Sequence, residues 1–487
     1  MKFNFTAKHT RLPIFQNQIQ AQIWYRSSLL LFLLYLAFCA QAQTRYYVNS
    51  SAAGANNGSS WANAFTDLQA ALAVAQSGDS VWIAQGVYYA TNGTDRMISF
   101  EPRSGVRMYG GFAGMESQLA ERDWETHRTI LSGDIGVQGD STDNTNNILF
   151  FGAVEEGTVI DGMTFLQGYS ETPGFVYDIF QREGCGGAIY VNAGDEEAYL
   201  LVQNCRFERN FARLKGGAVF VGASADGVIS PQFLNCSFAH NSGNDGVAVY
   251  CNGYADKERI PDFGDCTFSE NKILTNAPLS IIRYINAAKN DTLHFGGCIF
   301  EKYAGGSSGW RNIWTKSDNH IQLDSCVFRH NNIEFIRSDL FAPTVGSVKS
   351  TQVTNSLFTN NAYMLGINPL KSVIVNCIFK NSIGALSVNS LVAEISNCII
   401  DSCRHGTTLL DLSGECVDCT VSNMAISNNI AINSGGVFVW AVKNDEFVTY
   451  QNINMINNDR LGVFGANIYG DSITFRNFNF IGNRFYL

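Results

Sequence analysis

The amino-acid sequence predicts an all-β fold, a parallel β-helix whose N-terminal end is closed by a capping helix. Three observations predict it: a short phrase recurs along the chain, its copies are separated by nearly fixed steps, and the apolar residues within each copy lie two positions apart. The phrase is clearest at residues 204–210, with the sequence Asn-Cys-Arg-Phe-Glu-Arg-Asn. Repeats with a fixed period of about 20 to 50 residues are typical of solenoids rather than of globular cores.

Each copy of the phrase has a cysteine, or a substitute for it, at its second position, which we name the cysteine slot. The slot holds Met163, Cys205, Cys236, Cys266, Cys298, Cys326, Ser356, Cys377, Cys398 and Cys419. The step between slots is 28 to 32 residues from Cys205 to Ser356, and 21 residues from Ser356 to Cys419. Degenerate copies follow near Ile453 and Phe478.

Cys205 and Phe207 are two residues apart, so on an extended strand both side chains point to the same face, and the repeating unit is β. A second strand precedes the early copies, with the sequence Gly-Gly-Ala-Ile at 186–189 and related sequences at 216–219 and 246–249. Asn and Gly between the strands supply the left-handed backbone angles that tight bends need. We expect about a dozen rungs, each about 4.8 Å from the next, with Cys, Phe and Asn side chains stacked in ladders.

Residues 1–42 have the features of a secretory signal peptide: four basic residues, no acidic residue, an apolar run at 29–38, and Ala40-Gln41-Ala42 before the expected cleavage site. The alternative is an uncleaved membrane anchor, but residues 29–40 are too short for a comfortable span. Cleavage lowers the formal net charge from −10 to about −14. An acidic chain without a basic cluster is a poor partner for nucleic acids or anionic membranes, and the mature chain is expected to have no transmembrane span.

The N-terminal cap is placed at residues 45–90. From Phe65 the apolar residues follow helical spacing, so we predict a helix over Phe65–Gln76, with a capping box between Thr66 and Gln69. The helix is expected to cover the open apolar end of the solenoid, because terminal repeats need a polar outer face.

The mature chain, residues 43–487, is expected to form one β-helix. Strands at 80–83 and 87–89 are expected to begin its first rung. The rungs are long to about residue 355, are 21 residues long over about 356–440, and are degenerate from there to residue 487.

Several segments resemble secreted right-handed parallel β-helix proteins of the pectate-lyase-like superfamily. They are Tyr46-Tyr47-Val48, Asn56 to Trp61, Gly78-Asp79, Gly86-Val87-Tyr88, Tyr109 to Phe112, Arg122-Asp123-Trp124, Ile130 to Asp134 and Val159 to Gly162. The combination of Gly-Gly-Ala-Ile with Phe-x-x-Asn, as at 186–189 and 207–210, is similar to the repeats of polymorphic outer-membrane proteins. The resemblance covers residues 45 to about 440 and implies a single-stranded right-handed parallel β-helix that is exported. It implies little about function, because one fold hosts many functions.

Enzymes on this fold need a specific set of charged residues. A lyase needs a Lys or Arg base with Ca²⁺, and a hydrolase needs two or three carboxylates that converge in one groove. The best acidic cluster is Asp134, Asp140 and Asp143 in the loop at 133–147, where the spacing suits Ca²⁺. The alternative is that these are solvated turn residues, since Asp is favoured in any loop.

Other charged residues give no catalytic set. Asp195-Glu196-Glu197 is interpreted as a solvated bend, because adjacent side chains on a strand or turn rarely converge. Arg213 and Lys215 lie beside Gly216 and could act as a base, but nothing distinguishes them from ordinary surface cations. The catalytic residues, if the protein has any, are therefore unknown.

The cysteines of the repeat are expected to be buried free thiols, because stacking and not pairing explains their period. Export would permit disulfides. Cys398, Cys403, Cys416 and Cys419 have some likeness to a zinc site. Two of these four already belong to the repeat, so we favour a disulfide between Cys403 and Cys416, or two free thiols.

Trp310, Trp314 and Trp440 lie in irregular or strand-edge segments, and aromatic faces stack on sugars as on other apolar planes. The alternative is that they pack beneath loops. We expect function in departures from the repeat, chiefly at 133–147, 172–182 and 305–319.

The function favoured by the sequence is that of a secreted or cell-surface protein with a binding or adhesin-like role. Its partner is expected to be a polysaccharide or a cell-surface protein, and Ca²⁺ is the only cofactor considered. A polysaccharide lyase or other carbohydrate-active enzyme is the first alternative, and a passive structural stalk is the second.

Overall fold

The computed structural model describes residues 43–487 apart from residues 485–487 and several internal segments. The internal segments left out are 172–180, 225–226, 254–260, 275–279, 287–291, 304–310, 316–318, 332–333, 339–348, 363–364, 368, 385, 389, 406–407, 413–417, 432–436, 441–446 and 460–471. The chain divides into two compact units, Met1–Thr44 and Arg45–Leu487, and the described helices and strands belong to the second. The predicted signal peptide, residues 1–42, lies outside the described residues.

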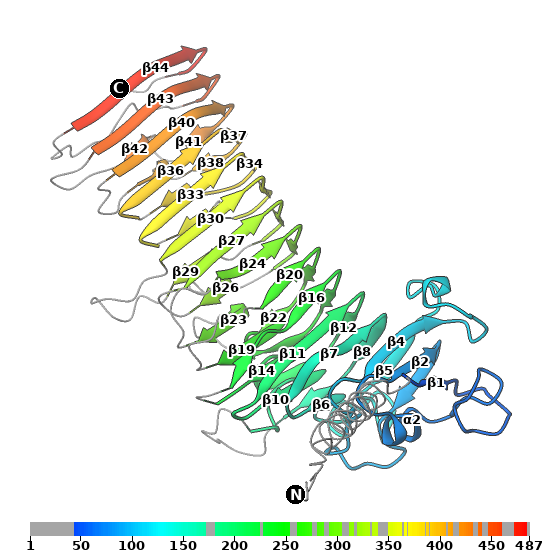
Figure 1. Ribbon diagram of the computed structural model, residues 1–487. Helices are drawn as coiled ribbons and strands as arrows, with labels where there is room; N and C mark the ends of the chain where they lie inside the picture. The colour runs from blue at the N-terminus through cyan, green and yellow to red at the C-terminus, as the bar shows by residue number, and fades with distance from the viewer. Residues whose placement is uncertain are drawn as a thin grey trace, which may run out of the picture. The chain divides into compact units, whose positions relative to one another are not determined.

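The second unit is a parallel β-helix, which confirms the predicted fold class (Figure 1). A 27-stranded sheet gives most rungs two arms that meet at a bend. The first arm is formed by β1 (Arg45–Val48), β2 (Ser80–Ala84), β4 (Arg107–Phe112), β7 (Val154–Asp161), β11 (Glu197–Gln203), β15 (Val228–Ile229), β16 (Gln232–Leu234), β20 (Asp262–Gly264), β24 (Thr292–Gly296), β27 (His320–Asp324), β30 (Ser350–Thr354), β33 (Lys371–Val375) and β36 (Val392–Ser396). The second arm is formed by β3 (Gly86–Tyr89), β5 (Thr129–Ser132), β8 (Met163–Leu166), β12 (Arg206–Glu208), β17 (Ser237–Ala239), β21 (Thr267–Ser269), β25 (Ile299–Glu301), β28 (Val327–Arg329), β31 (Leu357–Thr359), β34 (Ile378–Lys380) and β37 (Ile399–Asp401). The last strands run through both arms and are β40 (Asp418–Ser427), β43 (Phe447–Ile456) and β44 (Ser472–Ile481).

Smaller sheets complete the rungs. A seven-stranded sheet contains the strands predicted from the Gly-Gly-Ala-Ile segments: β6 (Leu149–Phe151), β10 (Ile189–Asn192), β14 (Val219–Gly222), β19 (Val249–Gly253), β23 (Ser280–Asn286), β26 (Arg311–Thr315) and β29 (Glu334–Ser338). Two four-stranded sheets are formed by β9 (Tyr169–Ser170), β13 (Phe211–Lys215), β18 (Ser242–Asp245) and β22 (Lys272–Ile273), and by β32 (Leu365–Ile367), β35 (Leu386–Val388), β39 (Thr408–Asp411) and β42 (Val437–Trp440). A two-stranded sheet is formed by β38 (Arg404–His405) and β41 (Ile430–Ala431).

Two residues per rung adopt a left-handed backbone conformation at the bends. In one rung they are Asn204, with a φ of 54°, and Arg209, with a φ of 55°. Asn, Asp and Ser fill most of the first bend positions, because a short polar side chain tolerates this conformation. The first positions of later rungs include Asn235, Asp265, Ser325, Asn355, Asn376, Asn397, Asn423, Asn452 and Asn477. Their side chains also join neighbouring rungs, as where Asn235 Nδ2 donates to Asn204 Oδ1 at 2.8 Å.

The phrase found in the sequence places its apolar side chains inside the helix, as predicted. Cys205 and Phe207 are buried, and the register stacks Phe207 on Phe238 of the next rung. Their ring centroids are 4.6 Å apart and their planes are 5° from parallel. Comparable stacking continues through Phe268, Phe300, Phe328, Phe358 and Phe379. The apolar burial of each rung thus depends on the rungs beside it.

The last residue of the phrase has a different role from the one that we expected. The residue before it makes the bend, while the Asn itself is buried and joins rungs by side-chain hydrogen bonds. Asn241 Oδ1 accepts from the backbone and side-chain nitrogens of Asn210 at 2.9 and 3.0 Å. Asn241 Nδ2 donates to Asn271 Oδ1 at 3.0 Å and to Phe207 O at 2.8 Å. Buried amides in this ladder therefore satisfy one another and the backbone of the bend.

The cysteine slot continues differently from the sequence prediction after Cys398. Strand β37 pairs with β40 so that Ile399 lies beside Ala425, which places Met424 and not Cys419 over Cys398. Cys419 lies one arm earlier, beside Ala393. The third 21-residue step was therefore wrong, because an interior Cys of the preceding arm matched the period. The degenerate copies are confirmed, since Met424 pairs with Ile453 and Ile453 with Phe478.

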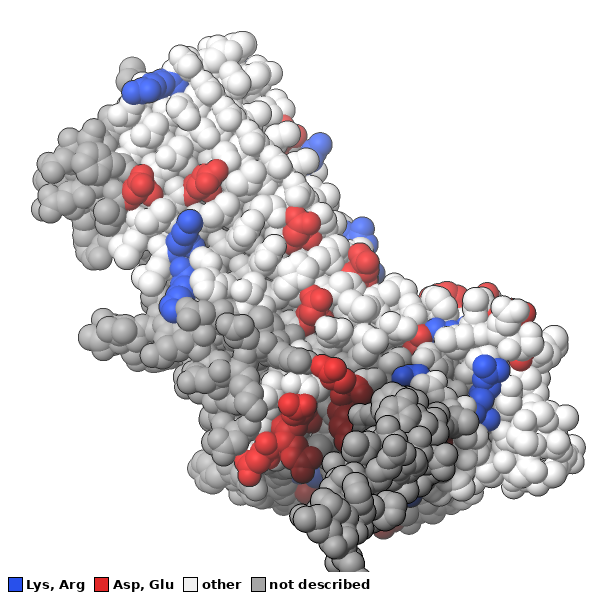
Figure 2. Space-filling view, viewed as in Figure 1, with Lys and Arg blue, Asp and Glu red and all other residues white. Residues whose placement is uncertain are grey.

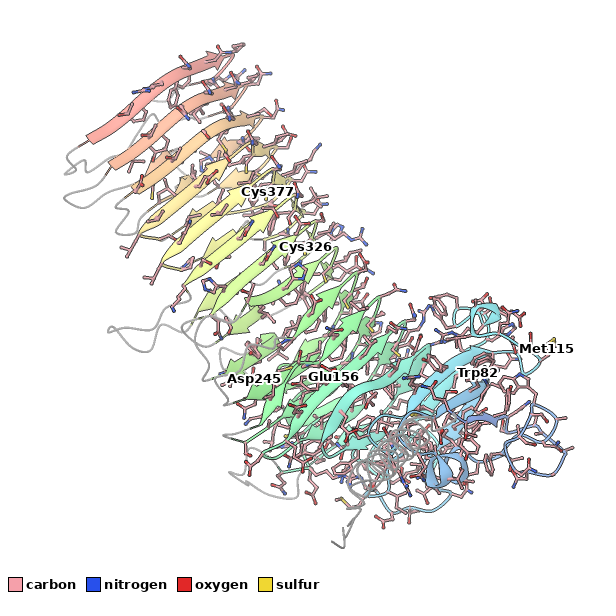
Figure 3. All side chains as sticks on the ribbon, in the orientation of Figure 1. Trp82, Met115, Glu156, Asp245, Cys326 and Cys377 are labelled. Atoms are coloured by element: carbon pink, nitrogen blue, oxygen red, sulfur yellow. The ribbon has the colours of Figure 1, made fainter. Side chains whose placement is uncertain are left out.

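The cysteines of the slot up to Cys398 are free and buried, as predicted. Cys326 and Cys377 lie in line along the stack (Figure 3). Burial raises the pKa of the Cys205 thiol to about 12, which keeps it protonated and unreactive at neutral pH. Cys419, in contrast, is disulfide-bonded.

Cys403 is free, so the proposed disulfide between Cys403 and Cys416 is wrong. The reason is its position: Cys403 takes the place of the ladder Asn, where its backbone nitrogen donates to Asn429 Oδ1 at 2.8 Å. Cys416 lies outside the described residues. Where residues are described, no group of three or more His, Cys, Asp or Glu side chains is placed to hold a metal ion, so the zinc reading of this cluster gains no support.

The capping helix is α2 (Leu68–Val74), at the N-terminal end of the stack (Figure 1). Its N-cap is Asp67, which accepts from the backbone nitrogen of Gln69 at 3.0 Å, so the predicted capping box at Thr66 was wrong. The stack also begins one strand earlier than expected, because β1 pairs with β2. A short 3₁₀ helix, η1 (Leu119–Glu121), lies in the loop after β4. The part of the chain that the structure describes holds no helix with the length and hydrophobicity of a membrane span.

We expect Asn241→Ala to lower the free energy of unfolding by about 2 to 3 kcal/mol, because it leaves buried partners of four hydrogen bonds unsatisfied. Urea denaturation followed by circular dichroism measures this. The control is Asn235→Gly, which keeps the left-handed bend at an exposed position and is expected to change stability little. Equal effects of the two variants would contradict a structural role for the buried ladder.

His405 predicts a pH dependence of stability. It is 5% exposed, its Nδ1 has no hydrogen-bond partner, and burial lowers its pKa from 6.5 to about 4. Between these pH values the unfolded chain binds a proton that the folded chain does not, so stability is complete above pH 6.5 and falls by up to about 3 kcal/mol towards pH 4. Denaturation midpoints across this range should flatten in His405→Leu. An unchanged slope in that variant would assign the acid sensitivity elsewhere.

Candidate functional site

The three aspartates predicted to bind Ca²⁺ each serve their own turn. Asp134 accepts from the backbone nitrogen of Gly139 at 2.9 Å, and Asp143 accepts from that of Val137 at 2.7 Å. Asp140 accepts from the backbone nitrogen and hydroxyl of Thr142, which lowers the pKa of that carboxyl. The arrangement fits the alternative of turn residues, and Ca²⁺ binding here stays a prediction.

Most of the predicted aromatic binding residues cannot be placed. Trp310 lies outside the described residues, as do most of 172–182 and 305–319. Trp314 is in β26, where its backbone pairs between Arg283 and Arg337. Trp440 ends β42. A ligand-binding role for Trp310 and Trp314 therefore stays a prediction.

The charged residues considered as catalytic candidates are engaged separately. Arg213 forms an ion pair of 2.7 Å with Glu171. The Lys215 ammonium lies 5.1 Å from the centre of the Tyr250 ring. Asp195 accepts a hydrogen bond from the Ser224 hydroxyl, while Glu196 and Glu197 are exposed. These groups do not meet in one site.

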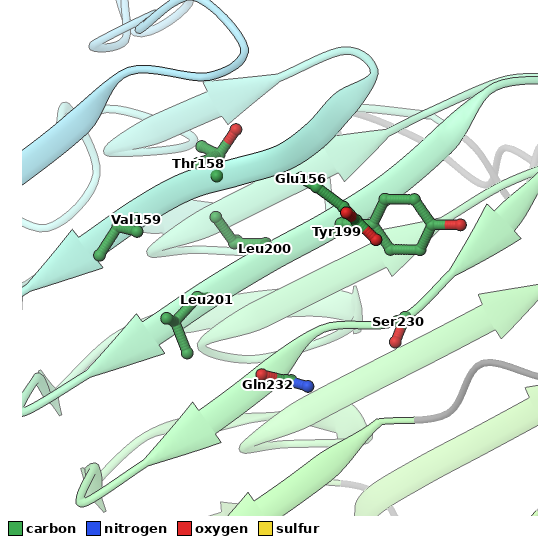
Figure 4. A pocket seen from close by; sticks show the side chains of 9 residues that line it. Glu156, Thr158, Val159, Tyr199, Leu200, Leu201, Ser230 and Gln232 are labelled. Carbon is green, nitrogen blue, oxygen red and sulfur yellow. The ribbon is translucent and has the colours of Figure 1, made fainter. Parts of the chain in front are cut away.

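A groove of about 240 Å³ lies on the outer face of the first arm, across β7, β11 and the segment joining β15 to β16. It is lined by Glu156, Gly157, Thr158, Val159, Tyr199, Leu200, Leu201, Ser230 and Gln232 (Figure 4). The lining comes from three successive rungs, so the groove depends on the stack and not on one loop. It lies in the part of the chain with long rungs.

A bulge creates the groove. Ala198 of β11 pairs with Val154 of β7, but Leu200 pairs with Thr158, so β7 has two more residues than its partner in this interval. The extra residues leave the ladder at Gly157, which has a φ of 92°. On the other side Pro231, which has no backbone N–H, separates β15 from β16. Bulges of this kind redirect side chains and are common beside functional sites.

The side chains of the groove combine apolar and hydrogen-bonding groups. Tyr199 and Leu201 alternate with the buried Leu200, so both point outward from β11. In Figure 4 the Tyr199 ring and the Glu156 side chain lie side by side at one end, and Gln232 lies at the other. Val159 and Leu201 supply an apolar floor between them.

A buried ion pair fixes the strands beneath the groove. The Asp161 carboxylate, at the end of β7, accepts from the Arg122 guanidinium, from Gln203 Nε2 at 2.6 Å and from Asn204 Nδ2 at 2.9 Å. Arg122 also lies over the Tyr109 ring, with 5.4 Å from its guanidinium carbon to the ring centre, and burial raises the pKa of Tyr109. Because a buried pair with satisfied hydrogen bonds holds its geometry, the register of β7 on β11 is set firmly here.

The groove has acidic surroundings. Glu155 and Glu156 on β7 and Asp195 to Glu197 before and within β11 are exposed. In Figure 2, acidic side chains gather over the region where Figure 1 shows β7 and β11. Arg107 lies beside Gly157, at the edge toward β4. The nine lining residues themselves include one carboxylate and no Lys or Arg.

This composition favours binding over the known chemistries of the fold. A hydrolase needs a second carboxylate across the scissile bond, and a lyase needs a cationic base. Neither is among the lining residues. An aromatic ring, an amide, a hydroxyl and a carboxylate around an apolar floor are instead suited to hold a polar ligand with a flat apolar side.

Sequence analysis missed the groove residues. Glu156, Tyr199 and Gln232 are 43 and 33 residues apart in the sequence and meet only through the stack. Two signals were present: Gly157 follows two glutamates inside a predicted strand, and Pro231 precedes a short one. Both residues mark interruptions of a ladder.

Comparisons with known proteins do not identify a family. No family model matches the sequence, and no curated protein matches it. Among solved structures, the chain is similar to the catalytic unit of a thermostable GH87 alpha-1,3-glucanase from Streptomyces thermodiastaticus, with 10% identity, a TM-score of 0.30, and coverage of 91% of this chain and 69% of that one. It is also similar to PfbA, a surface adhesin of Streptococcus pneumoniae, with 11% identity, a TM-score of 0.23, and coverage of 86% and 88%. Likeness at this level carries no argument about function.

Gly157→Ala tests the bulge. Its φ of 92° is costly for a residue with a side chain, while a Cβ there would meet only Arg107, at 4.0 Å, so the cost is one of backbone strain, about 1 to 2 kcal/mol in the free energy of unfolding. Gly152→Ala is the control, because a Cβ there meets nothing within 4 Å and its φ is not positive. Chemical denaturation should separate the two variants, and equal stabilities would argue against a strained bulge.

Proposed function

We propose that the protein is a secreted or cell-surface β-helix that binds a glycan through the groove on its first arm. The observation that carries this proposal is the Tyr199 ring placed beside a carboxylate and across from an amide, on the face of a rigid parallel sheet. Aromatic rings stack on the apolar face of a sugar ring, and amide and carboxylate groups accept or donate to its hydroxyls.

The sheet beyond the groove supports a chain-like ligand. Gln232 begins a row of outward residues that pair in register from rung to rung, and the row continues with Asp262, His294, Gln322 and Gln352. Asp262 and His294 are 2.7 Å apart, between Oδ1 and Nδ1. A hydrogen-bonding side chain is thus offered about every 4.8 Å, which suits successive units of an extended polymer better than a single small molecule.

Binding without turnover is favoured over a lyase. The groove lining offers no cationic base, and the acidic surroundings oppose a polyuronate substrate. A passive stalk would not need an outward aromatic side chain in a groove. Secretion rests on the predicted signal peptide, residues 1–42, and on the acidic mature chain.

Two variants of the groove test this proposal. Tyr199→Ala and Gln232→Ala are expected to weaken binding to a glycan retained from an array by about tenfold or more, as measured by calorimetry, because each removes a direct contact. Gln352→Ala is the matched control, an exposed glutamine of the same row three rungs beyond Asp262.

The contrary outcomes are equally clear. Equal losses in Gln352→Ala and Gln232→Ala would place binding outside the groove. Ultraviolet absorbance from unsaturated ends after incubation with uronate polysaccharides would establish a lyase and overturn the binding-only reading. Retention of no glycan would leave the groove without the proposed role.

A further inference from the structure

We propose that the groove selects a glycan with free amino groups, in which the ammonium of a 2-amino-2-deoxy sugar lies between the Glu156 carboxylate and the Tyr199 ring. This inference rests on the proposed function and names the chemical class of its ligand. It starts from the end of the groove where these two side chains lie side by side (Figure 4).

The pair has the chemistry of an ammonium site. A carboxylate forms charge-assisted hydrogen bonds with an ammonium group, and these are roughly twice as strong as neutral ones. The face of a tyrosine ring attracts the same cation through its quadrupole. A neutral hydroxyl or an N-acetyl group in that position would gain neither interaction in full, so the pair discriminates between an amine and its acetylated form.

The charges around the groove act in the same direction. Glu155 lies next to Glu156 on β7, and Glu196 and Glu197 lie at the start of β11, all of them exposed. Together they make the local potential negative, which raises the local concentration of a cationic polymer and speeds its association. Arg107 lies on the far side of Gly157, toward β4, and not among the lining residues.

The rest of the groove fits the sugar that carries the amine. The Ser230 hydroxyl and the Gln232 amide lie toward the opposite end, where ring hydroxyls can donate and accept. Val159 and Leu201 form the apolar floor for the C–H face of the ring. A free amine at one position and hydroxyls at the others match this distribution of groups.

A lysine-containing peptide is the other source of a primary ammonium, and the fold disfavours it. Extended peptides usually bind by adding a strand to the edge of a sheet. Here the groove lies on the face of the sheet, and the strands beneath it are already paired, β7 with β11 and β11 with β16. A peptide would find no row of backbone groups to pair with.

The test compares ligands that differ only in the amine. The full-length mature protein is titrated by calorimetry with a β-1,4-linked glucosamine oligomer, with the N-acetylated oligomer of equal length, with a cello-oligomer and with oligolysine. We expect the glucosamine oligomer to bind at least about tenfold more tightly than the other sugars, and this margin to shrink as salt is raised, because an ion pair at an open groove is screened.

The variants assign the effect to one carboxylate. Glu156→Gln should abolish the preference for the amine, while Glu155→Gln, which removes the same charge one residue away and outside the lining, should keep it. Circular dichroism verifies that both variants fold. Loss of the preference in both would assign it to the general potential and overturn the specific site.

The outcomes separate this inference from the proposed function. Equal affinity for the glucosamine and N-acetylated oligomers, with both lost in Tyr199→Ala, overturns the amine inference and leaves glycan binding intact. Binding of no sugar overturns both. Binding of oligolysine alone, with the same dependence on Glu156, would keep the ammonium site but replace the glycan with a protein partner.

Discussion

Backbone pairing in register between successive rungs is the constraint on which the rest of the structure depends. Because each strand pairs in parallel with the strand one rung later, residues at equivalent positions lie directly over one another. A side chain that suits the interior of one rung therefore suits the next, and Phe stacks on Phe while Asn bonds to Asn. The repeat in the sequence is a consequence of this register, since each rung provides half of its neighbour's core.

The same constraint explains why the candidate site lies where the register breaks. A regular ladder offers one environment repeated many times, which gives no unique place for a ligand. At β7 two additional residues leave the ladder, and the side chains of Glu156 and Tyr199 gather there instead of continuing two rows. The hydrogen-bonded row from Gln232 onward stays regular, so it can extend a contact but cannot define one.

The sequence predicted the fold because the repeat is local: Cys205 and Phe207 lie in one strand, and their spacing alone gives the face that they share. It failed where a residue satisfied the period by coincidence. Cys419 lies 21 residues after Cys398, yet pairing places it beside Ala393 in the preceding arm. Period counting cannot separate two interior positions of one rung. The groove was beyond prediction for a related reason, because Tyr199 meets Glu156 only if the bulge at Gly157 shifts the register by two residues.

A site built on a bulge needs support against slippage, and the structure supplies it within the same strands. The Asp161 carboxylate binds Arg122, Gln203 and Asn204, so it ties the end of β7 to the end of β11 directly after the groove. If β7 slipped on β11, this buried carboxylate would lose partners in a low-dielectric setting, which costs more than the strain that slippage would relieve. The bulge is therefore held between paired strand on one side and a buried ion pair on the other. The groove is thereby formed before any ligand arrives, and a preformed site loses less conformational entropy on binding than one that must assemble.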